Sequence, residues 1–148
     1  MPKGKQATTA DAEICMKLYD LRREAEMRKA RNFVNFLFHP QSADEILKTI
    51  LVFTSPESAW LRMVFSFWDY AASLVLEGVV APSLFFAWNG EMVFVYAKYK
   101  PFLEEMRTKM ENPEFLKKVE KAVNSVPEVS KNVEVIQQRL AKMAAAQG

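Results

Sequence analysis

WLRMVFSFWDYAASLVLEG, residues 60–78, is mostly large and apolar, yet it contains one arginine and one aspartate, Arg62 and Asp69. On a helix, the polar side chains of this stretch fall on one narrow stripe: Arg62, Ser66, Asp69, Ser73 and Glu77. The rest of the circumference is apolar, which is typical of the central helix of a bundle. We therefore predict that a helix over about residues 56–77 lies at the centre of the fold.

The composition is that of one globular domain. The chain has 148 residues, of which 50% are hydrophobic and 26% charged, enough to bury a single core. Its formal net charge of +2 at pH 7 neither requires nor excludes an acidic partner. The single cysteine, Cys15, excludes an internal disulfide and favours a reducing compartment, the cytoplasm.

Neither a secretory signal nor a membrane-spanning helix is expected. The N-terminal residues MPKGKQATTADAE contain two lysines but no apolar stretch behind them. The apolar region 50–76 carries Arg62 and Asp69, and each such charge costs about 2.5–3.5 kcal/mol at the centre of a spanning helix. We therefore predict that the chain is not transmembrane.

Caps, prolines and glycines divide the chain into helices, and strand signals are weak. Four glycines are too few for a turn-rich β protein, so we predict an all-α fold, a compact bundle of about six helices around the central helix. Apolar residues at spacings of four, three and four predict the buried face of the first helix: Ile14, Leu18, Leu21 and Ala25. The expected helices span residues 11–38 with a bend near Arg23, 42–53, 56–77, 82–88, 91–111 with a kink at Pro101, 113–125, and 127–146.

The domain boundaries follow from these segments. We expect a disordered tail over residues 1–10 and one helical-bundle domain over residues 11–146. The last helix, 127–146, could also be an association helix, because its apolar residues form a seam: Val129, Val133, Ile136, Leu140 and Met143. The seam covers only about two heptads, so packing against its own domain is the favoured interpretation and self-association the alternative.

Residues that carry catalytic or metal chemistry are scarce. Cys15 and His39 are the only soft metal ligands, which excludes a structural zinc site within one chain. The glycines form no phosphate-binding loop, and no Gly-x-Ser-x-Gly motif is present. We therefore expect no catalytic residue, no metal and no cofactor. Acid/base catalysis by Asp69, Glu77 or Glu91 is the remaining enzymatic alternative.

The basic stretch RREAEMRKAR, residues 22–31, is a second feature that could carry a function. Its arginines could contact phosphates, but Glu24 and Arg28 also form an i,i+4 pair, as on an ordinary solvated helix. Nearby acidic residues weaken the positive potential, so nucleic acid is an unlikely partner.

Arg62 and Asp69 cannot pair with each other within one helix. Seven residues separate them by roughly 10.5 Å of rise, and the arginine side chain leans away from the aspartate. If they are buried, each needs a partner from another element, so we predict a cross-helix network. The donors expected for Asp69 are Arg22, Arg23, Arg28 and Arg31, and the acceptors expected for Arg62 are Asp20, Glu24, Glu26 and Glu91.

Aromatic side chains gather between residues 60 and 99. Core packing is their favoured interpretation, and a cavity for a flat apolar ligand is the alternative. The candidate ligand or interface residues are Arg62, Ser66, Trp68, Asp69, Trp88, Asn89 and Glu91.

Three runs resemble a family of small uncharacterised all-helical bacterial proteins. They are LYDLRREAEMRKARNFV, FWDYAASLVLEG and NGEMVFVYAKYKPFLEEMR, and the resemblance covers about residues 14–125. It implies an intact all-α domain and no particular activity. We therefore expect a non-enzymatic interaction or scaffold protein that self-associates or serves as a small subunit of a larger complex. The alternative is a small-molecule-binding bundle with an aromatic-lined cavity beside the Arg62/Asp69 stripe.

Overall fold

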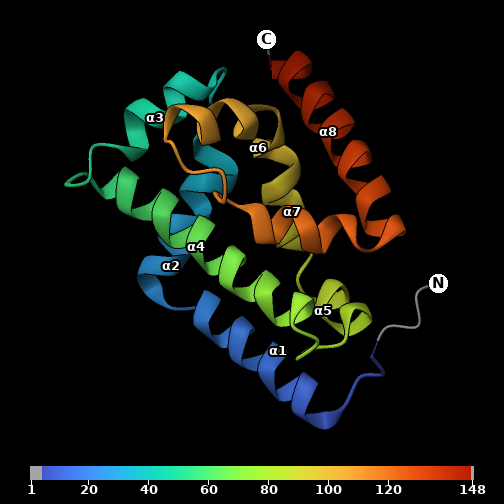
Figure 1. The fold of residues 1–148 in the computed structure, drawn as a ribbon. Coiled ribbons are helices and arrows are strands. Elements are labelled where there is room, and N and C mark those ends of the chain that lie inside the picture. The colour runs from blue at the N-terminus through green and yellow to red at the C-terminus, as the bar shows by residue number, and fades with distance from the viewer. Residues whose placement is uncertain (1–4, 148) are drawn as a thin grey trace.

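A computed structural model, which describes residues 5–147, shows an all-α fold with no strand in that range (Figure 1). The predicted fold class is confirmed. In chain order the elements are α1 (Thr9–Arg22), α2 (Ala25–Asn32), the π-helical turn η1 (Phe33–Leu37), α3 (Ala43–Ile50), α4 (Pro56–Leu76), α5 (Pro82–Trp88), α6 (Gly90–Lys109), α7 (Lys117–Asn124) and α8 (Pro127–Gln147).

The central helix is α4, which contacts α2, η1, α3 and α7 and crosses the middle of the molecule in Figure 1. Its start follows from local chemistry. The Ser55 hydroxyl accepts a hydrogen bond from the Ser58 N–H at 3.1 Å, and Pro56 occupies the first turn, where its missing N–H costs nothing. Its end follows from Gly78, whose φ of +73° places it in the left-handed region that glycine tolerates best.

The predicted helix 11–38 is three elements rather than one bent helix. It breaks after Arg22 because the Glu24 carboxylate accepts from the N–H groups of Glu26 and Met27 and so caps a new helix, α2. The buried face of α1 also differs from the predicted one. Its buried residues are Asp11, Cys15, Leu18 and Arg22.

The helix ends at η1, so the last carbonyl groups of this turn receive no hydrogen bond from a following helical turn. Lys98 of α6 supplies the donors. Its Nζ donates to the carbonyls of Val34 (2.9 Å), Asn35 (3.1 Å) and Phe38, and the Tyr99 hydroxyl also donates to Val34 O at 2.8 Å. One lysine of α6 thus fixes the end of the first helical region.

Pro101 lies inside α6 and has no N–H to donate to the Ala97 carbonyl, its partner in a regular helix. Gln137 of α8 donates from Nε2 to that carbonyl at 3.2 Å. The backbone group left free by the proline is therefore satisfied by a side chain of the last helix.

Two predicted boundaries differ from the structure. The helix predicted from residue 113 begins at Lys117, after Leu116 in a left-handed conformation with φ of +54°. Near the N-terminus, α1 begins at Thr9, inside the predicted tail 1–10, and Lys5 donates to Asp11 and to Val79 O at 2.8 Å. Residues 1–4 of that tail lie outside the described part.

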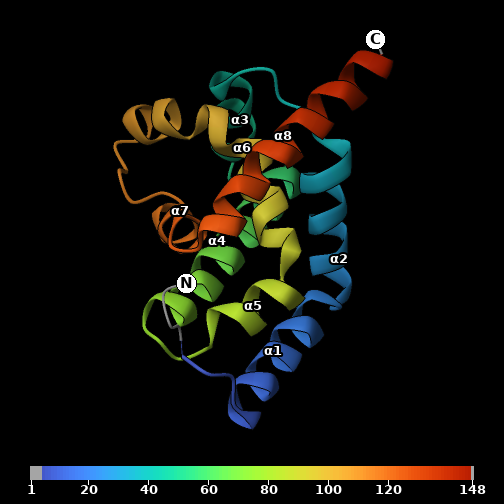
Figure 2. The same cartoon turned by 90° about the vertical axis from the view of Figure 1, so that its right-hand side faces the viewer.

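The helix α8 packs on α6 and α7 through the N-terminal half of its apolar seam. Val133 is buried, Val129 and Ile136 pack against the core, and Met143 is 58% exposed. Figure 2 shows the C-terminal end of α8 extending past the other helices. Within residues 5–147, no helix is both long and apolar enough to cross a membrane.

Candidate functional site

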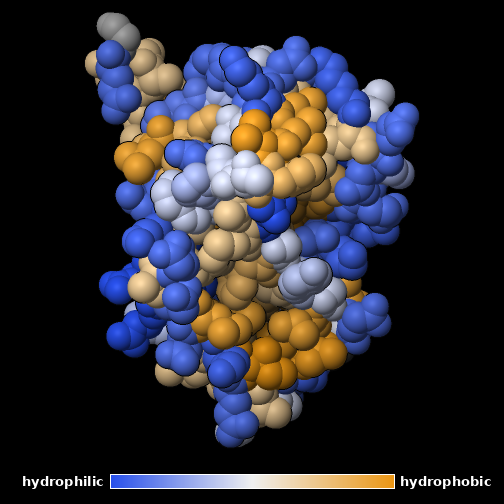
Figure 3. All heavy atoms as spheres, turned by 90° about the vertical axis from the view of Figure 1, so that its left-hand side faces the viewer, coloured by the Kyte–Doolittle hydropathy of each residue, from blue (hydrophilic) through white to orange (hydrophobic). Residues whose placement is uncertain are grey.

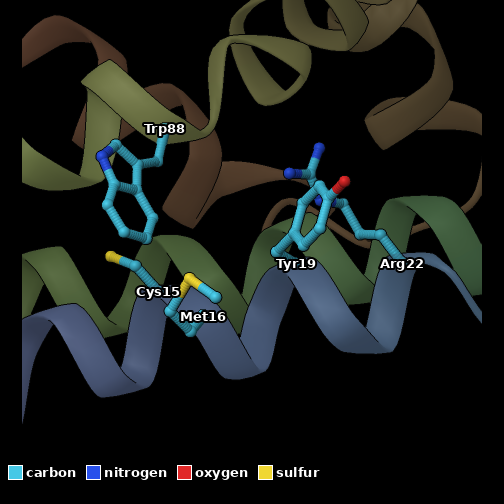
Figure 4. Close-up of a pocket in the computed structure, with 5 residues that line it drawn as sticks. All are labelled: Cys15, Met16, Tyr19, Arg22 and Trp88. Atoms are coloured by element: carbon cyan, nitrogen blue, oxygen red, sulfur yellow. The ribbon is translucent and has the colours of Figure 1, made fainter.

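A pocket of about 290 Å³ lies between α1 and α5 (Figure 4). One wall is a single face of α1, and the other is the last residue of α5. Its lining consists of Cys15, Met16, Tyr19, Arg22 and Trp88. Apart from the guanidinium, the tyrosine hydroxyl and the indole N–H, these side chains present carbon and sulfur, so the pocket is mainly apolar.

The position of Trp88 is set by the end of α5. Both the backbone N–H and the side-chain Nδ2 of Asn89 donate to Phe85 O, each at 2.9 Å, and Asn89 is buried. This fixes the turn from α5 to α6 and leaves Trp88 42% exposed beside the pocket that it lines. Cys15 lies opposite it and is only 1% exposed, and burial raises the pKa of its thiol.

The polar end of the pocket is formed by Arg22, which is only 9% exposed. Its guanidinium carbon lies 5.6 Å from the centroid of the Tyr19 ring and 5.4 Å from that of the Trp68 ring. Figure 4 shows the guanidinium behind Tyr19, with one terminal nitrogen turned toward the Trp88 side and the other turned away from α1. Within residues 5–147, the buried Nε of Arg22 and the buried Nε1 of Trp68 have no hydrogen-bond acceptor.

An ion pair lies behind this end of the pocket. Arg31 binds the Glu91 carboxylate through Nε and Nη2, at 2.8–3.0 Å, and donates from Nη1 to the Arg22 carbonyl at 3.1 Å. The pKa of Arg22 is lowered, mainly by burial, while the Glu91 charge acts in the opposite direction. Glu91 thus hydrogen-bonds to Arg31, and it acts on Arg22 only as a nearby charge.

A larger hollow of about 440 Å³ lies at the break between α1 and α2. Its lining residues are Asp20, Arg23, Glu24 and Arg28, all exposed. Two acids face two bases there, and the hollow has no apolar wall to exclude water from a ligand. The smaller pocket is therefore the better candidate site.

The structure does not bring all the predicted site residues together: some lie in or next to the pocket, and others lie on the exposed edge of α4. Trp88 lines the pocket, Trp68 lies under Arg22, and Asn89 and Glu91 are behind it. Arg62, Ser66 and Asp69 do not line it. The polar stripe on α4 is largely an exposed edge, with Arg62 and Ser66 exposed and Asp69 half-buried.

The predicted network around Arg62 and Asp69 is wrong in its partners. Asp69 accepts from the backbone N–H groups of Lys118 (3.1 Å) and Val119 (3.2 Å) at the start of α7. Arg62 donates to Ser58 Oγ and Phe53 O, each at 3.3 Å. The prediction failed because α7, and not the first helical region, faces Asp69. Arg31, one of the donors expected for Asp69, and Glu91, one of the acceptors expected for Arg62, instead pair with each other.

Cys15, Met16, Tyr19 and Arg22 were absent from the predicted site. The missed signal is the spacing of residues 15, 19 and 22, which is one helix face. An arginine on such a face usually lies at the solvent boundary, so the pattern alone does not reveal that Arg22 is buried. In the range 5–147, no group of three or more His, Cys, Asp or Glu residues is arranged to hold a metal ion.

Large hydrophobic side chains are also exposed outside the pocket. Figure 3 shows them on one face, in a group in the upper half and another near the bottom, each bordered by hydrophilic residues. Five that are at least half exposed come from η1 and from the connection between α3 and α4: Phe36, Leu37, Leu51, Val52 and Phe53.

A family model described as a domain of unknown function (DUF4760) matches residues 7–126, which include all the elements from α1 to α7. The match agrees with the resemblance of residues 14–125 to an uncharacterised helical family. No curated protein and no solved structure matches the chain. The helix α8 begins where the match ends.

Proposed function

We propose, for a chain that belongs to the DUF4760 family of unknown function, that it is a non-enzymatic binding protein for a small, flat and mostly apolar molecule held between α1 and α5. The single observation that supports this is the pocket lined by Trp88 and the Cys15–Tyr19–Arg22 face of α1. An apolar pocket with a few converging polar groups is the usual form of a small-molecule site.

The size and lining of the pocket limit its occupant. Its volume of about 290 Å³ is near the lower end of the range of roughly 300–1,000 Å³ for ligand sites. An aromatic molecule of one or two rings would lie between Trp88 and Tyr19 and gain ring–ring contacts of about 0.5–1.5 kcal/mol each.

Native mass spectrometry of the gently purified chain and calorimetric titration with naphthamide, a neutral two-ring probe, test this proposal. We expect saturable binding that Trp88→Ala weakens at least about tenfold, because the substitution removes one wall. Tyr70→Ala is the matched control, since Tyr70 is an aromatic residue 72% exposed on α4 that does not line the pocket. A chain that carries no small molecule and binds no two-ring probe would contradict the proposal.

A second candidate function is that of an interaction or scaffold protein, which self-associates or joins a larger complex. It is favoured by the exposed side chains of Phe36, Leu37 and Phe53 and by the exposed end of the α8 seam at Met143. Sedimentation velocity over a hundredfold concentration range tests self-association. We expect a dimer that Phe53→Lys or Met143→Lys dissociates; a monomer throughout would exclude self-association.

The cellular compartment is also a proposal. The free thiol of Cys15, the single cysteine of the chain, supports a reducing compartment such as the cytoplasm. Fractionation of cells that express the tagged chain tests this, and recovery in an oxidising or membrane fraction would contradict it.

A further inference from the structure

Arg22 is only 9% exposed, and no residue in the range 5–147 provides a hydrogen-bonded anion for its guanidinium. None of its nitrogens donates to a protein acceptor, and of these nitrogens Nε is fully buried. A largely buried charge is normally paired, because burial removes much of its hydration. The rings of Tyr19 and Trp68 compensate only in part, since a cation–π contact contributes about 0.5–2 kcal/mol.

The local charges leave one positive charge to be balanced. Arg22 and Arg31 carry two positive charges, and Glu91, which receives the Arg31 guanidinium, carries one negative charge. No other acidic side chain hydrogen-bonds to either arginine among the residues that the structure describes. One added negative charge would neutralise the group.

We propose that the occupant of the pocket is a flat apolar monocarboxylate, with its carboxylate bound by the Arg22 guanidinium and its apolar part between Trp88 and Tyr19. This rests on the proposed function, because it specifies the charge of the molecule that the same pocket binds. A guanidinium matches a carboxylate through two parallel hydrogen bonds. The Trp68 indole, whose ring lies under the guanidinium, has a second buried donor without an acceptor, Nε1.

A phosphate monoester fits the same chemistry less well. It carries about 1.5 to 2 negative charges at pH 7, which exceeds the one positive charge of Arg22, the cationic residue of the lining. The lining has few further donors, namely the Tyr19 hydroxyl and the Trp88 indole N–H, to hold the extra charge. The pocket therefore favours a carboxylate over a phosphate.

The test compares three probes of the same apolar shape by calorimetry at pH 7: naphthoate, naphthamide and naphthyl phosphate. We expect naphthoate to bind at least about tenfold more tightly than either of the others, because it alone forms a charge-balanced pair with Arg22. Equal affinity for naphthoate and naphthamide would overturn the inference while leaving the proposed function in place. No binding of any probe would overturn both, and tightest binding of naphthyl phosphate would overturn the assignment to a carboxylate.

Two matched variants test the role of Arg22. We expect Arg22→Gln to bind naphthoate and naphthamide about equally, and Arg28→Gln, which removes an exposed arginine of α2, to keep the wild-type preference. Unchanged preference in a folded Arg22→Gln variant would overturn the inference. Arg22→Lys keeps the charge without the fork of donors, and should retain a reduced preference. It provides the same test if Arg22→Gln does not fold by circular dichroism.

Trp88 locates the bound probe, because it forms the wall of the pocket that α5 contributes. Trp88→Ala should weaken naphthoate binding at least about tenfold, whereas Tyr70→Ala, at an exposed ring of α4, should leave it unchanged. Equal affinity of Trp88→Ala and the wild type for naphthoate would place the probe elsewhere and overturn the inference.

Discussion

Asp69 of α4 and Val119 of α7 are joined by a hydrogen bond in which the Asp69 carboxylate accepts from the Val119 backbone N–H at 3.2 Å. The same carboxylate oxygen accepts from the Lys118 N–H at 3.1 Å. A side chain of the central helix thus acts as the N-terminal cap of another helix, a role usually played by the residue just before it. Leu116, in that position, has no side chain able to cap.

Removal of this cap should loosen α7. We expect Asp69→Ala to lower the free energy of unfolding by about 1 kcal/mol, the usual cost of losing an N-cap, and to speed amide exchange at Lys118 and Val119. Ser66→Ala is the control on the same stripe, since the Ser66 hydroxyl donates only to its own helix at Met63 O. Equal stability of the two variants in urea would show that the cap contributes nothing.

The contribution of Gln137 to stability should depend on the proline at position 101. Gln137→Met removes the donor to the Ala97 carbonyl, and we expect a loss of about 1 kcal/mol of stability. In a Pro101→Ala background, residue 101 regains an N–H that can bond Ala97 O, so the same substitution should cost less. A double-mutant cycle in urea measures this coupling, with exposed Gln138→Met as the control. Strict additivity would refute the relationship.

Lys98 predicts a dependence of stability on alkaline pH. Burial lowers the pKa of Lys98 to about 8 from an ordinary value of 10.5. Between pH 8 and 10 the unfolded chain therefore holds more protons than the folded chain at this site, so its contribution to stability should rise with pH. Below pH 8 both states are protonated, and this contribution should be flat.

Chemical denaturation at pH 7, 8, 9 and 10 measures the Lys98 effect, with Lys98→Met expected to lose the rise. Exposed Lys100→Met should keep it. The range stops at pH 10 because burial raises the pKa of Tyr96 from 10.0 to about 12. Above pH 10 this tyrosine ionises in the unfolded chain but not in the folded one, which lowers stability. A wild-type profile that parallels Lys98→Met would disprove the assignment.

Asp11 predicts a loss of stability in acid. Its pKa is lowered to about 2 from 3.8, first by the hydrogen bond from Lys5 and also by the Ala81 N–H, which donates at 3.1 Å; burial opposes both. Its stabilising contribution should be complete above about pH 4 and lost as pH falls through 2. Acid titration followed by circular dichroism should show a smaller decrease in Asp11→Asn, with exposed Glu13→Gln unchanged from the wild type.

The sequence predicts those features that depend on near neighbours in the chain. The predicted helix 56–77 agrees with α4, Pro56–Leu76, because its signals act within a few residues: the Ser55 cap, Pro56 in the first turn and the left-handed Gly78. The all-α class follows from the weak strand signals and the small number of glycines, and the central position of α4 follows from the apolar circumference of that helix.

The candidate site depends instead on contacts between distant segments. Trp88 could be singled out as an aromatic residue, but its position over Cys15 depends on how α5 packs against α1. Arg22 could not be recognised, since the first helical region was predicted to continue past it, and a break by the Glu24 cap changes which face is buried. The pairing of Arg31 with Glu91, sixty positions apart, is likewise a property of the folded chain.

Hydrogen bonds hold α1 and α5, the two walls of the pocket, together near both of their ends. Asp11, at the start of α1, holds Ala81 at the start of α5, and Arg31 binds both the Arg22 carbonyl at the end of α1 and Glu91 just beyond α5. Because α5 is held near both ends, it cannot rotate away from α1 to open the pocket. Access to the pocket should therefore require only rotation of exposed side chains such as Met16 and Tyr19, a motion of picoseconds to nanoseconds rather than microseconds.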